Sequence, residues 1–337
     1  MHACVCGGGA IGHVLAAVLG AKADVSVSVL TRTSQHWRRR VEIHCGDRYR
    51  LEGRLHKASD DVAACVRGAD AVLLALSAPA RAQVLARIAP HLKPGSWVAC
   101  VGNSIGFDGD ARALLGPGGR FLGFQRTPWV ARLITPGQLV RVSGVRAAVL
   151  VAGAPADQLP TFAAALGCAI GVHLPVSGNY HDVSLAYDNA TLHPPRLYSL
   201  FGPERLAAAG QGFYRDWDDS ASQWLLDIDE ELQALRRSLG ATGAGSARRH
   251  FGVSHAGPLT RLIRSSVALR EIGLPVLAAA ATGTAVQPDL ASRFFQEDIA
   301  YGLALQHRMA ARAGIETPKI GRLLDWARGA FQLADPQ

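Results

Sequence analysis

The 337-residue sequence lacks the features that mark membrane, metal-binding and disulfide-bonded proteins. No stretch reaches the roughly 18 uninterrupted apolar residues that a membrane-spanning helix needs. The apolar segment at 3–19 is broken by four glycines and has no basic region before it, so we do not interpret it as a secretion signal. The six cysteines show no Cys-x-x-Cys or other metal-ligand spacing. We therefore expect reduced thiols in a cytoplasmic protein, and no metal site.

Long runs of basic residues are also missing, although the formal net charge is +8. The arginines are scattered, with short clusters only at Arg38–Arg40 and Arg236–Arg237, and no nucleic-acid-binding motif accompanies them. We expect neither nucleic acid nor membrane as a partner. A solvated basic surface that attracts anionic small molecules explains the charge better.

The N-terminal segment carries a glycine pattern typical of dinucleotide binding. A short apolar strand is predicted at Ala3–Cys6, followed by Gly7-x-Gly9-x-x-Gly12 and an apolar helix from about Ala10. Gly7 permits the tight turn, Gly9 lets the backbone approach a pyrophosphate, and Gly12 lets the helix pack on the strand. The helix N-terminus presents free N–H groups to the phosphates. The cofactor-binding residues predicted here are Gly7, Gly9, Ala10, Ile11 and Gly12.

The second predicted strand, Val25–Leu30, ends without the Asp or Glu that NAD-specific proteins place there for the ribose 2′-hydroxyl. Thr31 and Arg32 follow instead, and a guanidinium suits the 2′-phosphate of NADP. We therefore predict NADP(H) as the cofactor, bound by Thr31 and Arg32 with Arg38 as a further candidate, and NAD(H) as the alternative. The competing interpretation makes Arg32 a solvent-exposed loop residue.

Apolar strands alternate with helices through the first half of the chain, which indicates a parallel sheet covered on both faces. A small antiparallel excursion is predicted at 41–55, and a hairpin of 139–143 with 147–151. Ligands of such sheets bind beyond the carboxyl ends of the strands. This rule predicts cofactor contacts from Ser77, Ala78 and Asn103. It also predicts substrate contacts from Arg126 and Thr127.

Beyond residue 177 the pattern becomes helical. The predicted fold class is α/β: an N-terminal Rossmann domain with a doubly wound parallel sheet at 1–177, then an all-helical substrate domain at 178–337. Pro194 and Pro195 are expected to interrupt any helix near His193. Asp289 is expected to cap one long helix, from Leu290 to about Ala313.

Three segments of the helical half form a further pattern. They are 188–194 (Asp-Asn-Ala-Thr-Leu-His-Pro), Phe213-Tyr214 leading into 228–231 (Ile-Asp-Glu-Glu), and 293–303 (Arg-Phe-Phe-Gln-Glu-Asp-Ile-Ala-Tyr-Gly-Leu). Together they resemble the octopine/nopaline (opine) dehydrogenase family, in the group with C-terminal domains like that of 6-phosphogluconate dehydrogenase. With the glycine pattern, the similarity touches most of the chain. Ala300 stands where the family usually has proline, and the acidic pair before it is intact.

The resemblance implies a catalytic pair of His193 and Asp298. It also implies that Arg293 holds a substrate carboxylate and that Asn189 contacts substrate. Histidine suits proton transfer near neutral pH, and a carboxylate on its other ring nitrogen fixes the tautomer. Arg126 can grip a carboxylate as well, and the sequence does not rank it against Arg293. Residues five apart on a regular helix differ by about 140°, so Arg293 joins Asp298 only if that helix begins irregularly.

The predicted function is that of an opine-type dehydrogenase. It would condense an amino acid, or a related amine, with a 2-oxo acid through an imine in an NADPH-dependent step, giving an N-(carboxyalkyl) amino acid. One alternative is a ketopantoate-reductase-like enzyme that reduces a 2-oxo acid, which calls for a catalytic lysine in the helical half. Lys319 is the only lysine after Lys93. The other alternative is a non-catalytic NADPH-binding sensor. Partners are small molecules in each case, and assembly as a homodimer stays open.

Overall fold

The structure is a computed structural model, and it divides into two compact units, Met1–Ser184 and Leu185–Gln337. It describes the whole chain except residues 47–48, 103, 204–206, 209, 278–285 and 333–337. The division falls a little beyond the predicted boundary at 177 because the following turn packs onto the first unit. There the Tyr180 hydroxyl donates to the Ser104 carbonyl oxygen over 3.2 Å, and the Tyr180 ring meets Phe121 edge-on. Among the described residues, no helix has the length and apolar character needed to cross a membrane.

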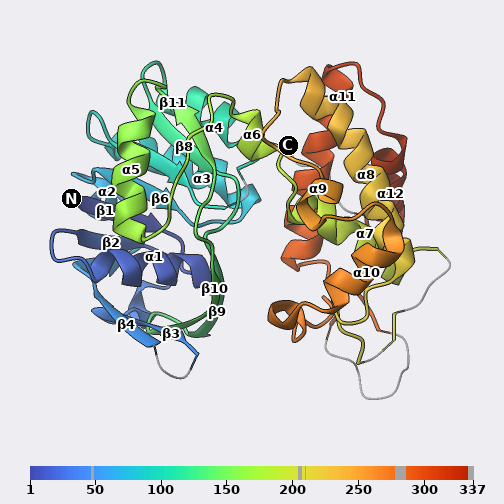
Figure 1. The fold of residues 1–337 in the computed structure, drawn as a ribbon. Helices are drawn as coiled ribbons and strands as arrows, with labels where there is room; N and C mark the ends of the chain where they lie inside the picture. Colours follow the sequence, from blue (N-terminus) through green and yellow to red (C-terminus); the bar gives the residue numbers. More distant parts are fainter. Residues whose placement is uncertain (47–48, 103, 204–206, 209, 278–285, 333–337) are drawn as a thin grey trace. The chain divides into compact units, whose positions relative to one another are not determined.

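A seven-stranded sheet forms the centre of the first unit (Figure 1), in the order β11-β8-β7-β6-β1-β2-β5. Its strands are β1 (His2–Cys6), β2 (Ser26–Leu30), β5 (Lys57–Ser59), β6 (Ala71–Leu74), β7 (Trp97–Cys100), β8 (Arg120–Phe124) and β11 (Val151–Ala154). All pairs are parallel except β11 with β8. The six parallel strands follow the Rossmann order, so the predicted fold class is confirmed.

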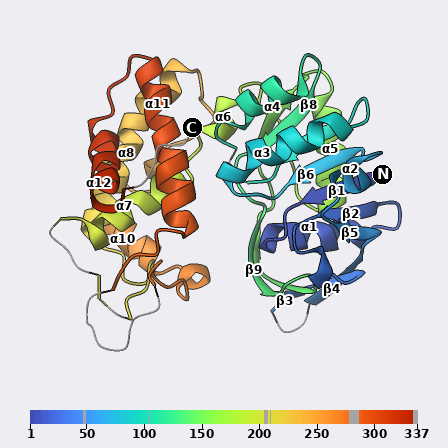
Figure 2. The ribbon, with the colours of Figure 1, turned by 180° about the vertical axis from the view of Figure 1, so that it is seen from behind.

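Helices cover both faces of this sheet. Figure 1 shows α1 (Ala10–Gly20) and α5 (Leu159–Ile170) on one face, and Figure 2 shows the other face. The helices of that second face are α2 (Val62–Val66), α3 (Ala78–Ile88) and α4 (Phe107–Leu115). The side chains of β1 alternate between two separate hydrophobic cores. Ala3 and Val5 enter the first, while Cys4 and Cys6 enter the second, as period-two strand geometry requires.

A second sheet of four strands, in the order β4-β3-β10-β9, packs on α1. Its strands are β3 (Arg40–Cys45), β4 (Tyr49–Arg54), β9 (Trp129–Thr135) and β10 (Leu139–Val145). The predicted antiparallel excursion at 41–55 is confirmed by β3 and β4. The predicted hairpin of 139–143 with 147–151 is wrong, because β10 instead pairs with β9 across a turn at Gly137. Gly137 has a φ of 73°, which favours glycine.

The second unit is helical and is organised around α7 (Asn189–Phe201), which packs against α8 (Asp219–Ser238) and η4 (Phe294–Leu303). The remaining helices of this unit are α9 (Ala247–Phe251), α10 (Ala256–Arg264), the 3₁₀ turn η3 (Val267–Leu269), α11 (Ala304–Arg312) and α12 (Pro318–Phe331). Short helical turns of the first unit are η1 (Ser34–His36), η2 (Ala89–His91) and α6 (His181–Ser184). An all-helical second unit agrees with the prediction.

Two helices of this unit differ from the sequence-based expectation. Pro194 and Pro195 do not interrupt α7, which runs through both of them. Each proline lacks an N–H, so α7 gives up two backbone hydrogen bonds. Burial of both rings against α8 and η4 holds the helix together despite that loss. The predicted helix from Leu290 begins instead at Phe294, because Asp289 accepts a hydrogen bond from the Ala291 N–H within a preceding turn.

His13 on α1 links the glycine-rich turn to the second sheet. Its Nδ1 donates to the Gly9 carbonyl over 2.9 Å, and its Nε2 accepts from the Gly137 N–H over 2.7 Å. The ring is fully buried and stacks on Trp37 with centroids 4.1 Å apart. Both nitrogens are therefore satisfied only when the imidazole is neutral. Burial lowers the pKa of His13, and its bond to Gly9 opposes that shift only in part.

We predict that His13 makes the protein less stable in mild acid. Because its pKa in the folded protein lies below the ordinary value of 6.5, the unfolded chain binds the proton more readily. The stabilisation is complete above about pH 6.5, and it falls by up to about 1.4 kcal/mol per pH unit below that value. Urea unfolding at pH 7.5 and 5.5 measures it. His13→Asn should show a smaller loss between the two pH values, and equal losses in both proteins would contradict the prediction.

Candidate active site

His193 and Asp298 meet inside the helical unit. His193 lies in the second turn of α7 and Asp298 lies in η4, 105 residues later. His193 Nδ1 is 2.6 Å from Asp298 Oδ2, and the two side chains are 1% and 5% exposed. A carboxylate only accepts, so Nδ1 carries the hydrogen and donates it. This bond fixes the ring orientation and the tautomer, and leaves Nε2 to face the other side of the site.

Tyr214 occupies the opposite side of the same imidazole. Its hydroxyl oxygen is 2.6 Å from His193 Nε2, and the residue is 5% exposed. Burial raises the pKa of Tyr214 well above its ordinary value, and the positive charge of Arg293 opposes that shift. The phenol therefore keeps its proton and donates to Nε2 when the imidazole is neutral. Phe213-Tyr214 belongs to one of the three segments that carry the family resemblance, but no local pattern predicts a place for the hydroxyl in the site.

Aromatic rings enclose the imidazole. The ring of Phe294 lies 4.6 Å from that of His193, and the ring of Phe213 meets it edge-on at 5.4 Å. Water is therefore excluded from an ion-forming pair, which strengthens its electrostatic interaction. His193 is therefore a buried, enclosed side chain and not an exposed one at the helix surface.

The segment that carries Asp298 is a π-helix, not the regular helix assumed from the sequence. Its i→i+5 hydrogen bonds widen each turn, so residues five apart come nearly above one another. This irregularity removes the geometric objection to a shared site for Arg293 and Asp298. Arg293 precedes the first turn of η4, is exposed, and lies with its guanidinium 5.8 Å from the centre of the Phe294 ring. Its charge acts on the Tyr214 hydroxyl.

Gly302 lets the two helices of the pair approach each other. A Cβ at residue 302 would lie 2.6 Å from the Cβ of Ala190 on α7, well inside contact distance. Ala190 therefore fills the space beside Gly302, which is a packing position between α7 and η4.

The start of α7 is fixed by Asp188, whose Oδ1 accepts from the Ala190 N–H over 3.0 Å. Asn189 is the first residue of the helix and is exposed. It lies four residues before His193 and so shares its helix face. A substrate contact from Asn189 stays a prediction.

Arg196 holds the loop that presents Tyr214. It is 1% exposed and donates from Nε to the Phe213 carbonyl over 3.0 Å and from Nη2 to the Asp216 carbonyl over 2.6 Å. Its Nη1 also contacts the Asp218 carboxylate at 2.7 Å. The guanidinium thus binds the backbone on both sides of Tyr214. Sequence reasoning missed this role, since nothing in the local pattern separates Arg196 from other arginines.

The glycine-rich turn has the shape that a dinucleotide requires. Gly7 has a φ of 124°, and a Cβ there would lie 2.3 Å from the Ala75 carbonyl oxygen. A Cβ at Gly12 would lie 2.0 Å from the Gly7 carbonyl oxygen, so the helix packs directly on the turn. A Cβ at Gly9 would meet no atom within 4 Å. Gly9 therefore faces open space at the N-terminus of α1, where N–H groups and the helix dipole can hold a pyrophosphate.

A pocket of about 430 Å³ opens beside this turn in the first unit. Gly7, Gly9, Thr31 and Arg32 line it, in agreement with their predicted cofactor role, although contact with a cofactor stays a prediction. Arg87, Gln83 and Asp60 line it as well and were not singled out from the sequence.

Five other predicted cofactor residues do not line this pocket. Ala10, Ile11 and Gly12 lie in the first turn of α1, Ser77 precedes α3, and Ala78 is the first residue of α3. Asn103 lies outside the described residues.

Arg126 and Thr127 lie in the first unit, in the loop between β8 and β9, and both are half-buried. The positive charge of Arg126, added to the larger effect of burial, lowers the pKa of Arg146. The two guanidinium groups are therefore close enough to repel each other. Arg293 belongs to the second unit, so the two candidate carboxylate-binding arginines come from different parts of the chain.

Within the described residues, no group of three or more His, Cys, Asp or Glu side chains could hold a metal ion.

Two family profiles match the chain. The α-helical domain of NAD/NADP octopine/nopaline dehydrogenases matches residues 176–331, and the ketopantoate reductase PanE/ApbA profile matches residues 3–151. Tauropine dehydrogenase of Arabella iricolor is 25% identical over 96% of this chain and 90% of its own length. The helical half of this chain is thus similar to the opine dehydrogenases, and the similarity to tauropine and octopine dehydrogenases extends over nearly the whole chain.

Solved structures of the opine dehydrogenase family share the fold. Octopine dehydrogenase with NADH and L-arginine superposes with a TM-score of 0.82 at 20% identity, over 100% of this chain and 92% of that one. Yersinopine dehydrogenase with NADP⁺ superposes with a TM-score of 0.73 at 15% identity, over 98% and 91% of the two chains. At these sequence identities, the structural similarity shows that the fold is shared and shows nothing further.

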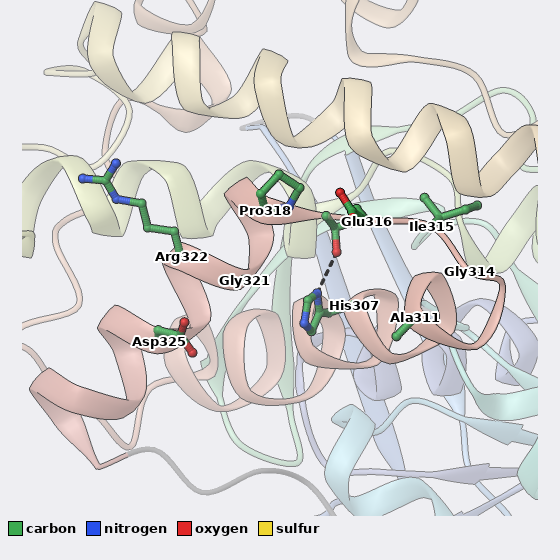
Figure 3. A pocket seen from close by; sticks show the side chains of 10 residues that line it. His307, Ala311, Gly314, Ile315, Glu316, Pro318, Gly321, Arg322 and Asp325 are labelled. Atoms are coloured by element: carbon green, nitrogen blue, oxygen red, sulfur yellow. Dashed lines mark hydrogen bonds between the residues drawn. The ribbon is translucent and has the colours of Figure 1, made fainter.

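A separate groove of about 780 Å³ runs between α11 and α12 in the second unit. Figure 3 shows His307 among the residues that line it, and Arg322 extending away from His307. His307 Nδ1 lies 2.7 Å from the Thr317 hydroxyl oxygen. Neither His193 nor Asp298 lines this groove. The size of a cavity therefore does not identify the candidate active site, whereas the buried histidine pair does.

We predict that Gly302→Ala separates the helices that carry His193 and Asp298. The added methyl group would overlap Ala190, and overpacking of this kind costs about 1–3 kcal/mol. Gly329→Ala on α12 is the matched control, because a Cβ there meets nothing within 4 Å. It should stabilise the protein by about 0.5–1 kcal/mol through helix propensity. Denaturant unfolding compares the two variants, and a Gly302→Ala variant as stable as the control would contradict the packing argument.

Proposed function

We propose that this protein is an opine-type dehydrogenase that condenses an amino acid, or a related amine, with a 2-oxo acid, using NADPH to reduce the product of condensation. The product is an N-(carboxyalkyl) amino acid. The observation that carries this proposal is the buried contact between His193 and Asp298, on a helical unit that follows a nucleotide-binding fold. Relatives named for opine chemistry support it, among them tauropine and octopine dehydrogenases.

The chemistry requires a group that gives and takes protons near neutral pH. When an amine adds to a carbonyl carbon, the oxygen must later leave as water, and that step needs a proton. His193 can supply it, because Asp298 stabilises the imidazolium through the Nδ1–H bond. A nicotinamide nucleotide, when bound, would supply the hydride that reduces the resulting C=N bond. The role of the protein is to deliver the proton and orient the reactants.

Arg293 is the residue we assign to the 2-oxo acid carboxylate. It is exposed, and its guanidinium lies over the Phe294 ring and forms no ion pair among the described residues, so its donors are available. An arginine can bind a carboxylate through two parallel hydrogen bonds, which fixes orientation as well as position. Asn189 and the pair Arg126 and Thr127 are our further candidates for substrate contacts.

Two arginines favour NADPH as the cofactor. Arg32 and Arg87 both line the pocket beside the glycine-rich turn, and Asp60 is its one lining carboxylate. Among the described residues that line it, the pocket therefore carries an excess positive charge, which suits a 2′-phosphate. The exposed Arg38 does not line this pocket, and its backbone N–H bonds to the Gly137 carbonyl.

The ketopantoate-reductase alternative rests on the profile match to residues 3–151, which lies outside the helical unit. The one lysine available to it in that unit, Lys319, has its Nζ 3.0 Å from Asp227 Oδ2 and 5.0 Å from the centre of the Trp224 ring. This lysine ties α12 to α8 and is not placed with His193. The reductase reading is therefore the weaker one.

We predict that NADPH oxidation requires both a 2-oxo acid and an amine. The assay uses pyruvate, glyoxylate or 2-oxoglutarate with and without a panel of amino acids. His193→Ala should lower kcat by about 10²–10⁴-fold with little change in the NADPH Kd. His255→Ala, an exposed histidine at the start of α10, is the matched control and should keep the wild-type rate. Turnover with oxo acid alone would favour the reductase, and an unchanged kcat in His193→Ala would refute the proposed role.

We predict that Arg32 sets the preference for NADPH over NADH. A charge-assisted contact with the 2′-phosphate contributes about 1.5–3 kcal/mol, so Arg32→Ala should lower kcat/KM for NADPH by about 10- to 150-fold and leave NADH nearly unaffected. Arg87→Ala should act in the same direction. Arg38→Ala is the control and should change neither value. Equal NADPH-to-NADH ratios in wild type and Arg32→Ala would exclude the phosphate contact.

A further inference from the structure

We propose that Asp60 limits the preference of the cofactor pocket for NADPH and lets the pocket bind NADH as well. This inference rests on the proposed function and concerns the same pocket beside the glycine-rich turn. Arg32 and Arg87 attract the 2′-phosphate that distinguishes NADPH from NADH. Asp60 opposes them, so the difference between the two affinities is smaller than the arginines alone would produce.

The sheet places Asp60 beside the residues assigned to the 2′-phosphate. β5 pairs with β2 in parallel, with Ser59 opposite Leu30, and the Thr31 N–H donates to the Ser59 carbonyl over 2.9 Å. Asp60 and Thr31 are therefore the first residues beyond the carboxyl ends of two neighbouring strands, which lie about 4.8 Å apart. Asp60, Thr31 and Arg32 all line the pocket. A group bound at Thr31 and Arg32 thus lies within the electrostatic reach of the Asp60 carboxylate.

The fold does not use the Asp60 carboxylate. The side chain is exposed and, among the described residues, it forms no hydrogen bond and no ion pair. The neighbouring acid differs, because Asp61 caps α2 with its Oδ1 accepting from the Ala64 N–H over 3.0 Å, and it does not line the pocket. Packing and helix capping therefore explain Asp61, whereas Asp60 is available to a bound molecule.

Asp60 stands in for an acid that β2 lacks. Dinucleotide-binding proteins that use NAD carry an Asp or Glu near the end of the second strand, where it accepts from the ribose 2′-hydroxyl. Here Thr31 and Arg32 follow that strand, and the acid follows the neighbouring strand β5. A carboxylate only accepts hydrogen bonds, so it suits the 2′-hydroxyl of NADH and repels the 2′-phosphate of NADPH.

The charges that line the pocket decide which nucleotide is affected. Among the described residues, the ionised side chains of the lining are Arg32, Arg87 and Asp60. Neutralising Asp60 therefore doubles their net positive charge. A phosphate monoester carries about −1.5 to −2 charges at pH 7, whereas a hydroxyl carries none. Both nucleotides carry the same pyrophosphate, so its contribution cancels when the two affinities are compared.

The test removes the charge of Asp60 and keeps its shape. In Asp60→Asn the Kd of NADPH should fall by about 3- to 20-fold, because one repulsive charge is lost at close range in a partly solvated pocket. The Kd of NADH should not fall, so the ratio of the NADH Kd to the NADPH Kd should rise at least about threefold. Titration calorimetry of the full-length protein measures both values without substrate.

Asp61→Asn is the matched control. It removes a charge from the adjacent, equally exposed acid, and asparagine caps a helix about as well as aspartate, so α2 should stay intact. Both Kd values should remain within about twofold of wild type. A ratio that rises less than threefold in Asp60→Asn, or that rises equally in Asp61→Asn, would overturn the role of Asp60.

A second comparison tests whether Asp60 acts on the nucleotide or through Arg32. If the acid acts on the bound phosphate, Asp60→Asn should change the Kd ratio by a similar factor in the wild-type and Arg32→Ala backgrounds. Loss of the change in Arg32→Ala would contradict a direct effect. Adenosine 2′,5′-bisphosphate and adenosine 5′-phosphate, which lack nicotinamide, should give the same result as NADPH and NADH.

These titrations separate the inference from the proposed function, because they need no turnover. Absence of an amine-dependent reaction in the wild-type protein would refute the proposed function and leave the effect of Asp60 on cofactor affinity standing. An unchanged Kd ratio in Asp60→Asn, with amine-dependent turnover intact, would overturn the role of Asp60 alone.

Discussion

The hydrogen bond between His193 and Asp298 is the constraint on which the helical unit depends. It joins residues 105 apart and requires two helices to cross at very close range. Gly302 against Ala190 provides that approach. The π-helical winding of η4 sets the direction of Asp298 and brings Arg293 toward the same face. The first unit supplies a glycine-rich turn with open space at Gly9.

Removing one member of the His193–Asp298 pair would destabilise the protein. A buried ionisable group without its partner is strongly destabilising, whereas a matched pair within an aromatic enclosure is tolerated. The surroundings of the pair break several local rules at once: two prolines lie inside α7, η4 is a π-helix, and Tyr214 and Arg196 are polar groups in the core. Such exceptions are expected where function competes with stability. The rest of the chain, with its alternating strands and capped helices, follows the rules.

Local patterns predicted the parts of the chain that local physics decides. The strand–turn–helix at Gly7–Gly12 and the parallel sheet follow from glycine geometry and apolar runs. The proline rule failed at Pro194 because burial between α8 and η4 outweighs two missing hydrogen bonds. The π-helix has no signature of its own in the sequence, and so the place of Arg293 could not be derived from regular spacing. His193 and Asp298 came from a family resemblance, and Tyr214 was missed because its partner is distant in sequence.

The protonation pattern of His193 tests the central claim most directly. In protein labelled with ¹⁵N at histidine, NMR across the neutral pH range reports which ring nitrogen carries hydrogen in the neutral form. Because the Asp298 carboxylate accepts from Nδ1, the neutral ring should be the Nδ1–H form. In Asp298→Asn this preference should be lost. A neutral His193 that carries its hydrogen on Nε2 in the wild-type protein would contradict the account.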